Sequence, residues 1–381
     1  MQGSRVIGRA GNMQETASND ATVPAGETAP VFVTGAAGHV GANLVRRLCR
    51  DGVACRVFLR HEDNNEGLAG LPVETTYGDL RDLNSVRKAI EGCQKVYHVA
   101  AKISTIYGNQ EHRREIFDTN VLGTRNLLQA AREGGAGRVV VTGSFSAVGH
   151  DLTDASLPSD ETMPFYPMQE AMPYEISKSQ CEMECWHAAA RGQDVMVATS
   201  CAMVGPADYF PSRLGRTLYD YANGKLRAYV EGGFEFVAAD DLVEGHLLTM
   251  ERGRSGEKYI FSTEYKLISE IVSLFEEVTG VPRPQRRIPA PIMLPFSEVA
   301  SAYLSRFHPD FPQRFTPGAI RLLKKRRCAN LTKVREELGY RPTNIRTAVQ
   351  AAYAFHHERG FITNPDARPP VVPEIANSTE G

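Results

Sequence analysis

The 381-residue sequence has no long apolar run and no excess of charge of one sign. A membrane-spanning helix needs roughly 20 apolar residues, but the longest charge-free apolar stretch, residues 195–207, is broken by Thr199, Ser200, Gly205 and Pro206. We expect a buried strand and its exit turn there, and no membrane span. The 43 basic and 45 acidic residues leave a formal net charge of −2. This balance argues against a protein whose main task is coating nucleic acid or an anionic membrane.

Signals for disulfides, metal binding and export are also missing. The seven cysteines are odd in number and include no C-x-x-C pair, so the sequence predicts no disulfide framework and favours a reducing cytoplasm. Cys181 and Cys185 are four residues apart but have no His or Cys pair at finger-like spacing, so we expect no metal site. No apolar segment follows Arg5 and Arg9, as a secretory signal would require.

Between two irregular ends, strands and helices alternate along the chain. Residues 1–28 and 364–381 lack apolar periodicity and are predicted to be a disordered leader and a flexible tail. Residues 29–203 alternate between the two kinds of element, which predicts a Rossmann-type doubly wound parallel sheet, an α/β fold that binds dinucleotides. The expected strands are residues 30–34, 53–60, 73–78, 95–101, 138–144 and 195–202, and the two longest expected helices are residues 111–133 and 173–191.

Residues 204–363 are less regular, with more Pro, Gly and aromatic residues. They predict a smaller, mostly helical substrate lobe, with segments such as 235–252 returning to the sheet. Ligands of open α/β sheets bind in the cleft outside the carboxyl ends of the strands. We therefore expect the substrate between this lobe and the sheet.

A glycine-rich turn joins the first expected strand to the first helix. It reads Thr34-Gly35-Ala36-Ala37-Gly38-His39-Val40-Gly41. Gly35 permits a tight turn, Gly38 lets backbone N–H groups approach a pyrophosphate, and Gly41 lets the helix pack against the strand. The helix start, with His39 and Val40, offers unpaired N–H donors and a favourable dipole to an anion. The turn predicts a dinucleotide cofactor.

The end of the second expected strand indicates which dinucleotide. An acid at this point bonds the ribose 2′-OH of NAD, whereas a cation suits the 2′-phosphate of NADP. The strand ends in Arg60, and the first acids after it are Glu62 and Asp63. Because a guanidinium matches the geometry of a phosphate, Arg60 predicts a preference for NADP(H), with NAD(H) as the alternative.

The residues for chemistry follow the fifth expected strand. Tyr174 and Lys178 are four apart, so a helix starting at Pro173 places them on one face, and Ser144 ends the strand where the crevice lies. Reducing a ketone requires a hydride at carbon and a proton at oxygen. A neighbouring ammonium favours the phenolate form of a tyrosine, so Tyr174 can give or take the proton. Ser144 can bond the carbonyl oxygen, and Lys178 can also hold the nicotinamide ribose.

Together these motifs resemble the extended short-chain dehydrogenase/reductases of the NAD-dependent epimerase/dehydratase family, over roughly residues 30–360. The sequence is most similar to the group of dihydroflavonol reductases, 3β-hydroxysteroid dehydrogenases and hopanoid-associated sugar epimerases. Further motifs carry the resemblance: Gly78-Asp79-Leu80, His98-Val99-Ala100-Ala101, Asn120-Val121-Leu122-Gly123-Thr124, Val204-Gly205-Pro206, and the segments 232–237 and 241–246.

The resemblance implies cofactor-binding roles for several of these positions. Asp79 would bond the adenine amino group, and Leu80 would lie beside the ring. The backbone of Val99, Ala100 and Ala101 would line the ribose and the phosphates.

The resemblance also implies that Asn120 supports the active-site helix and that residues from Ser200 to Met203 face the nicotinamide carboxamide. Two positions depart from the family pattern. Gly143-Ser144 stands where the family usually has Ser-Ser or Thr-Ser, which makes Ser146 a second candidate for the serine. Ser200 stands where proline is common.

The favoured function is an NADPH-dependent ketone or aldehyde reductase, or the reverse alcohol dehydrogenase. The apolar tract 288–303 suggests an apolar secondary metabolite or a lipid-derived or steroid-like substrate. An NAD-dependent sugar-nucleotide epimerase/dehydratase is the alternative, and a non-catalytic nucleotide-binding protein is third. The basic run 324–327 is interpreted as a solvated helix end, so nucleic acid is not an expected partner. A helical face such as 111–133 is a candidate contact for a homodimer.

Overall fold

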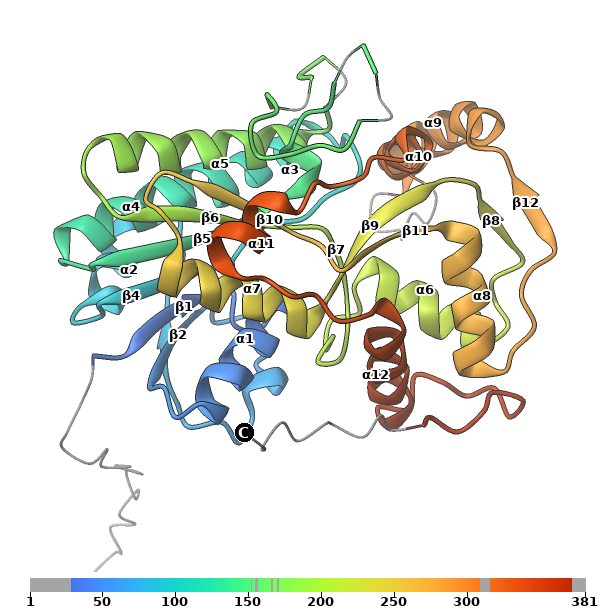
Figure 1. The fold of residues 1–381 in the computed structure, drawn as a ribbon, viewed down its shortest axis with the longest axis horizontal. Coiled ribbons are helices and arrows are strands. Elements are labelled where there is room, and N and C mark those ends of the chain that lie inside the picture. Colours follow the sequence, from blue (N-terminus) through green and yellow to red (C-terminus); the bar gives the residue numbers. More distant parts are fainter. Residues whose placement is uncertain are drawn as a thin grey trace, which may run out of the picture.

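The computed structural model describes residues 29–151, 153–154, 157–165, 167–169, 171–308 and 316–371. The leader predicted for residues 1–28 lies outside the described residues, as do residues 372–381 of the predicted tail. The chain forms two lobes side by side (Figure 1). One is built around a seven-stranded sheet, and the smaller one combines helices with two small sheets. No helix of the described residues has the length and apolar character needed to cross a bilayer.

The large sheet is parallel throughout, with the order β10-β6-β5-β4-β1-β2-β3. The strand order reverses between β1 and β4, and ligands of open α/β sheets bind beyond the carboxyl ends of the strands at such a point. The predicted Rossmann-type doubly wound sheet is confirmed. Its strands are β1 (Val31–Thr34), β2 (Cys55–Leu59), β3 (Val73–Tyr77), β4 (Lys95–His98), β5 (Arg138–Ser144), β6 (Val195–Ser200) and β10 (Lys258–Phe261).

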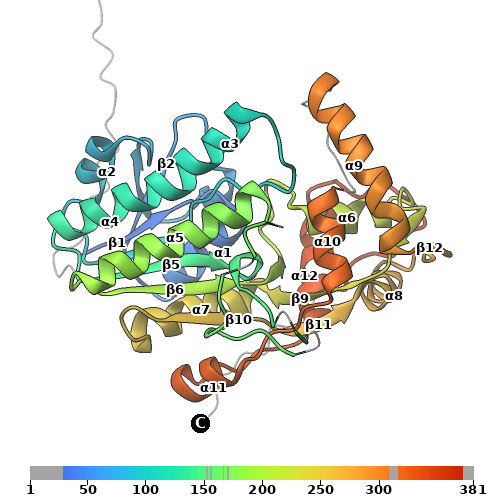
Figure 2. The ribbon, with the colours of Figure 1, turned by 90° about the horizontal axis from the view of Figure 1, so that it is seen from above.

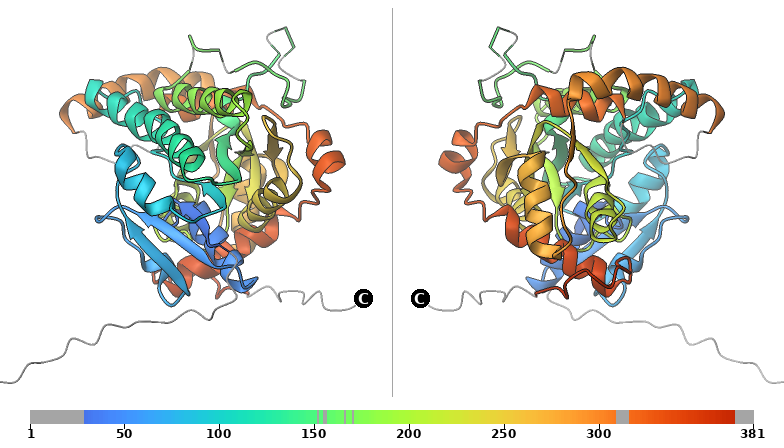
Figure 3. Two further views of the ribbon diagram at one scale, coloured as in Figure 1. Left: turned by 90° about the vertical axis from the view of Figure 1, so that its left-hand side faces the viewer. Right: turned by 90° about the vertical axis from the view of Figure 1, so that its right-hand side faces the viewer.

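Both faces of this sheet are buried, because the strands contain consecutive apolar residues whose side chains point alternately to the two faces. Val31 and Val33 pack into one cluster with Leu44, and Phe32 packs into the opposite cluster with Leu127. Figure 3 shows helices on both sides of the sheet. The first face carries α1 (His39–Arg50), α7 (Ala239–Arg252) and α11 (Thr332–Leu338); the second carries α2 (Leu83–Ile90), α4 (Gly123–Glu133) and α5 (Pro173–Ala190).

The helix predicted over residues 111–133 is interrupted in its middle. It consists of α3 (Gln110–Phe117), a π-helical turn (Asp118–Leu122) and α4. The wider turn carries Asn120, which is 1% exposed. Single π turns of this kind occur frequently at functional sites, and a periodicity argument cannot detect them.

The smaller lobe has its own apolar core, which includes Tyr221, Phe236, Phe275 and Tyr353. Its strands form one sheet of order β11-β9-β7 and one parallel pair of β8 and β12. The strands are β7 (Ala202–Val204), β8 (Ala228–Val230), β9 (Gly233–Ala238), β11 (Glu264–Leu267) and β12 (Arg286–Ile288). The helices are α6 (Arg213–Ala222), α8 (Ile268–Thr279), α9 (Ala290–Phe307), α10 (Pro317–Lys325) and α12 (Ile345–Glu358).

Three boundaries differ from the expectation. The sixth strand ends at Ser200, because the extended backbone is interrupted at Cys201 and continues as β7 in the other sheet. Within 204–363, the elements that return to the large sheet are α7, β10 and α11, whereas β9 stays in the smaller lobe. The first residues of the predicted tail are tied down: Asn364 Nδ2 donates to the Ala222 carbonyl at 2.8 Å, and Arg368 N donates to the Thr279 carbonyl at 2.7 Å.

Candidate active site

The glycine turn runs against the segment that follows β4. Gly35 has a φ of 69°, and a Cβ added there would lie 2.6 Å from Ala100 Cα. A Cβ on Gly41 would lie 2.1 Å from the Gly35 carbonyl oxygen. The turn is therefore closed to larger residues at both places. Gly38, the residue before α1, has no side chain that could cap the helix, and the first turn of α1 contains no acidic residue. The start of α1 with its unpaired N–H groups fits a diphosphate.

The side chain of His39 turns away from this turn. Its Nε2 lies 2.9 Å from the Pro206 carbonyl oxygen and 3.2 Å from that of Gly205, while Nδ1 lies 3.7 Å from Asp208 Oδ1. Burial lowers the pKa of His39, against the opposing effect of the Asp208 charge. The imidazole therefore already has partners in residues 205–208. Only the backbone of His39, like that of Val40, remains for the cofactor role predicted from the sequence.

Arg60 stands at the end of β2, as expected, and is exposed. Its guanidinium is held by acids: NH2 lies 2.7 Å from Asp63 Oδ1, and NH1 lies 3.2 Å from Glu62 Oε1. On the neighbouring strand end, Asp79 accepts hydrogen bonds from Arg81, whose side chain lowers the Asp79 pKa. Leu80 beside it is buried. The expected adenine-side residues therefore lie together, but each charged group already has a partner of opposite sign.

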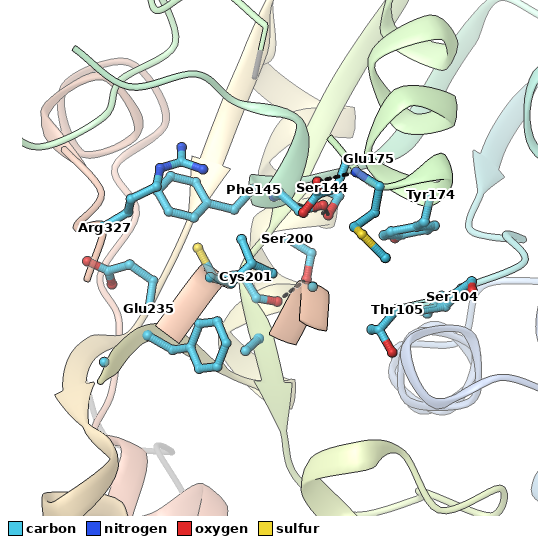
Figure 4. Close-up of a pocket in the computed structure, with 18 residues that line it drawn as sticks. Ser104, Thr105, Ser144, Phe145, Tyr174, Glu175, Ser200, Cys201, Glu235 and Arg327 are labelled. Carbon is cyan, nitrogen blue, oxygen red and sulfur yellow. Dashed lines mark hydrogen bonds between the residues drawn. The ribbon is translucent and has the colours of Figure 1, made fainter. Parts of the chain in front are cut away.

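Tyr174, Ser144 and Ser200 line one cavity of about 240 Å³ at the carboxyl ends of β5 and β6. Ser144 Oγ lies 2.8 Å from Ser146 Oγ, and both serines face the cavity. Figure 4 shows Tyr174 on one side of this cavity with Ser104 and Thr105, and Ser200 between them and the opposite wall. The structure thus brings Tyr174 and both serine candidates together. Met203 is only half-buried in β7 and is not among the lining residues.

Lys178 is buried behind Tyr174 on the same helix. Its Nζ donates to the Thr142 carbonyl at 2.6 Å, two residues before Ser144 on β5. The charge of Lys178 also acts on His98, whose pKa is lowered to about 3 by burial and by this ammonium. His98 is held between the hydroxyls of Thr34 and Thr124 and packs as a neutral ring.

Asn120 connects the segment after β4 to the helix of Tyr174. Its side-chain oxygen accepts from Lys102 N at 2.7 Å. Its Nδ2 donates to the Lys102 carbonyl at 3.0 Å and to Ser177 Oγ at 2.9 Å. Each polar atom of the buried amide is therefore used, and replacing it leaves a strand-end loop and a helix without their common partner.

The departure at Gly143 has a structural cause. A Cβ there would lie 2.6 Å from Val197 Cγ1 and 2.8 Å from Thr199 Oγ1. The side chains of the neighbouring strand thus leave no room for a larger residue at this position. Ser200 replaces a proline and donates to the carbonyl of Cys201 at 2.8 Å, at the point where the chain leaves the sheet.

Three charged residues of the cavity wall escaped the sequence analysis. They are Glu175, Glu235 and Arg327, and all three are buried. Arg327 was interpreted as part of a solvated helix end, and this interpretation is wrong. Its NH2 donates to the carbonyls of Val148 and Gly149 at 2.6 and 2.7 Å, and its guanidinium lies 4.7 Å from the Phe145 ring centre. A run of basic letters does not show that its last member turns inward.

Most of the remaining wall is apolar. It includes Ile103, Phe145, Met172, Phe234 and Leu322. The tract 288–303, which the sequence analysis used as evidence for an apolar substrate, contributes none of the described lining residues. The residues used for that argument were wrong, because the apolar wall comes from the loop after β4, the turn after β5, the residue before α5, strand β9 and helix α10.

Comparison with known proteins agrees with the geometry. A family model, described as the NAD dependent epimerase/dehydratase family, matches residues 31–262. The sterol demethylase protein B of Methylococcus capsulatus is 43% identical over 331 residues, which cover 87% of this chain and 99% of that protein. The 4-hydroxy-2-methyl-3-oxo-4-farnesyl-3,4-dihydroquinoline-1-oxide ketoreductase of Stigmatella aurantiaca is 29% identical, covering 81% of this chain and 91% of that protein.

A solved structure supports the same assignment. The crystal structure of gox2253 matches with a TM-score of 0.77 and 30% identity, covering 88% of this chain and 100% of that one. The resemblance inferred from the motifs is confirmed. The chain belongs to the NAD-dependent epimerase/dehydratase family of extended short-chain dehydrogenase/reductases, and it is an NAD(P)-dependent enzyme acting on CH–OH or C=O groups.

Proposed function

We propose that the protein interconverts a ketone and a secondary alcohol on an apolar, sterol-like or polyprenyl-like molecule, with NADP(H) as its cofactor. One observation carries the proposal: Tyr174 and Ser144 line the same mostly apolar cavity at the carboxyl ends of the central strands. The chemistry of a hydroxyl pair suits a carbonyl oxygen, and the wall suits hydrocarbon.

In this proposal the bound cofactor supplies or accepts the hydride at carbon. Tyr174 donates a proton to the carbonyl oxygen during reduction and takes it back in the reverse direction. Ser144, supported by Ser146, stabilises the developing charge on that oxygen. Lys178, one helical turn after Tyr174 on the same helix, is fixed by the Thr142 carbonyl and is proposed to hold the nicotinamide ribose.

The substrate class rests on the wall and on relatives. Phe145, Met172, Phe234 and Leu322 offer hydrocarbon contacts over most of the cavity, and burying such surface favours binding by about 25 cal/mol per Å². One relative is named as a sterol demethylase protein and another as the ketoreductase of a farnesylated ring. A fused-ring or prenylated ketone fits both the wall and these names.

The cofactor preference rests on Arg60. For Arg60 to meet a 2′-phosphate, its guanidinium must exchange Asp63 for the phosphate. Asp63→Ala should therefore tighten NADPH binding while leaving NADH binding nearly unchanged. Arg60→Asp should weaken NADPH by on the order of tenfold or more relative to NADH. Equal effects of Arg60→Asp on the two cofactors would refute the 2′-phosphate role.

The test of the function is an absorbance assay of the reduced cofactor with a panel of sterol-like and prenylated ketones. Tyr174→Phe should lower kcat on the order of 10²–10⁴-fold while cofactor binding persists. Ser144→Ala and Ser146→Ala, compared under the same conditions, identify the serine that contacts the substrate. Survival of turnover in Tyr174→Phe would disprove the assigned proton donor.

The family name favours one alternative, a sugar-nucleotide epimerase or dehydratase. Such an enzyme returns the hydride within one catalytic cycle, so it gives no net oxidation of added NADPH. Tightly bound NAD in the purified protein, together with no net reduction of any ketone, would decide for the alternative.

A further inference from the structure

Helix α9 presents large apolar side chains to solvent in one stripe. Its exposed residues are Ile292, Phe296, Val299, Tyr303 and Phe307, with exposed fractions between 55% and 73%. The spacings of four, three, four and four residues place all five within less than a quarter of the helix circumference. Single exposed apolar residues are ordinary, but a continuous stripe indicates an interaction surface.

The inward face of α9 combines small residues with two partly buried apolar side chains, Met293 and Leu294, which pack against a small apolar cluster. The buried residues of α9 are small: Ala290, Ser297 and Ser301. Ser297 Oγ donates within the helix to the Leu294 carbonyl at 2.7 Å. The five residues of the stripe face outward, and none of them joins an apolar cluster of the described residues.

The charge around α9 differs from that of the rest of the protein. Residues 281–331 hold ten Lys or Arg and only two Asp or Glu, a net charge of +8, whereas the whole chain carries −2. The other 330 residues therefore carry −10. Glu298, the one acid on α9, is paired with Arg321 of α10 at 2.5 Å. Arg327 of this segment is buried in the cavity wall. The positive charge beside the stripe therefore comes from Arg306 and Lys324, which are exposed on the two helices.

The helix stands at the edge of the smaller lobe. Figure 2 shows α9 beside α10, with one end projecting beyond its neighbours. α10 supplies Gly318 and Leu322 to the cavity wall, and Arg321 on the same helix contacts the hydroxyl of Tyr107 at 2.5 Å. Ile103, in the same segment as Tyr107, lines the cavity and is 72% exposed. The stripe is thus one helix away from the cavity.

We propose that α9 docks this protein on the surface of an anionic phospholipid membrane. The stripe enters the boundary between headgroups and acyl chains, and the basic residues around it contact the lipid phosphates. The helix lies in the plane of the surface and does not cross the bilayer. The nearly neutral net charge of the whole chain does not reveal this surface, because the positive charge is concentrated in one segment. The docking rests on α9 and the basic residues beside it. It does not depend on the proposed function, although an apolar substrate would reach the cavity from such a surface.

Co-sedimentation of the full chain with vesicles tests the proposal, without cofactor or substrate. Vesicles of pure phosphatidylcholine are compared with vesicles that also contain phosphatidylglycerol. The wild-type protein should sediment with the anionic vesicles, and salt should weaken the binding. Val299→Glu should weaken it about tenfold or more, because a carboxylate cannot enter the interface. Val371→Glu is the matched control, since the two valines are 73% and 75% exposed, and it should bind like the wild type.

A second pair of variants tests the charge. Arg306→Gln with Lys324→Gln should weaken binding to the anionic vesicles about tenfold. Lys88→Gln, an exposed lysine of α2, should leave it unchanged. Circular dichroism confirms that each variant is folded. Absence of wild-type binding to anionic vesicles would overturn the proposal. So would an oligomer that forms without lipid, loses its contacts in Val299→Glu and ignores vesicles, because the stripe would then join two copies of the chain.

Discussion

Glu175 gives the protein a pH-dependent stability that can be measured directly. This carboxyl follows Tyr174, lines the cavity and is 4% exposed. Burial raises its pKa from 4.5 to about 7, although the N–H of Met172 and the charge of Arg327 oppose the increase. The folded protein therefore keeps a proton on Glu175 at pH values where the unfolded chain has released it.

The sign of the effect follows from proton linkage. The folded state binds more protons between the two pKa values, so the contribution of Glu175 to stability is complete below about pH 4.5 and decreases as the pH rises through 7. One pKa unit corresponds to about 1.4 kcal/mol. The difference between 4.5 and about 7 therefore amounts to a loss of about 3 kcal/mol between acidic pH and about pH 8.

Glu175→Gln removes the titration and keeps an oxygen that can accept from Met172 N. The free energy of unfolding, measured by urea denaturation from about pH 5 to about pH 8, should fall for the wild type relative to Glu175→Gln. Glu133→Gln is the control: the bond from Arg87 lowers the Glu133 pKa to about 2, so it titrates below this range. A constant difference between wild type and Glu175→Gln across the range, within about 0.5 kcal/mol, would refute the argument.

Three further variants test the surroundings of the site. Asn120→Ala should lower kcat more than it raises KM, because the helix of Tyr174 loses its tie to the loop after β4; an unchanged kcat in this variant would argue against the tie. Gly41→Ala should abolish cofactor binding, since its Cβ would stand 2.1 Å from a backbone carbonyl, whereas Gly137→Ala, with 3.7 Å to its nearest neighbour, should bind normally. Lys258→Met should cost about 3 kcal/mol of unfolding free energy by leaving buried Glu182 unpaired, and the double variant with Glu182→Leu should recover most of it.

The sheet and the glycine turn were predictable because they follow from local rules. Alternating apolar residues such as Val31 to Val33 define a strand buried on both faces. The spacing of Gly35, Gly38 and Gly41 carries its own steric reason, which the close approach to Ala100 confirms. The prediction that Tyr174 and a serine come together needed only chain order and helix phase.

The rest of the site depends on contacts that no local pattern contains. Glu175, Glu235 and Arg327 are charged letters, which are normally interpreted as surface residues. They are buried because the loop after β5, strand β9 and the chain beyond α10 meet at one wall. His39 shows the same limit: its position in the turn suggested the cofactor, but its imidazole is bonded to carbonyls of residues more than 160 positions away.

The apolar tract 288–303 shows why periodicity alone cannot assign a face. The spacing of Phe296, Val299 and Tyr303 is that of an amphipathic helix, and such a stripe normally packs into a core. The structure shows that this helix packs inward through Ala290, Met293 and Leu294 and leaves the stripe exposed. The exposed stripe, not the buried face of the helix, is the basis of the docking proposal. The net charge of −2 gave no warning, because a sum over 381 residues cancels the +8 concentrated between residues 281 and 331. Counting charge by segment, together with the exposure of the stripe, identifies this surface. The periodicity alone would assign the stripe to the core, and the net charge alone would not single out the segment.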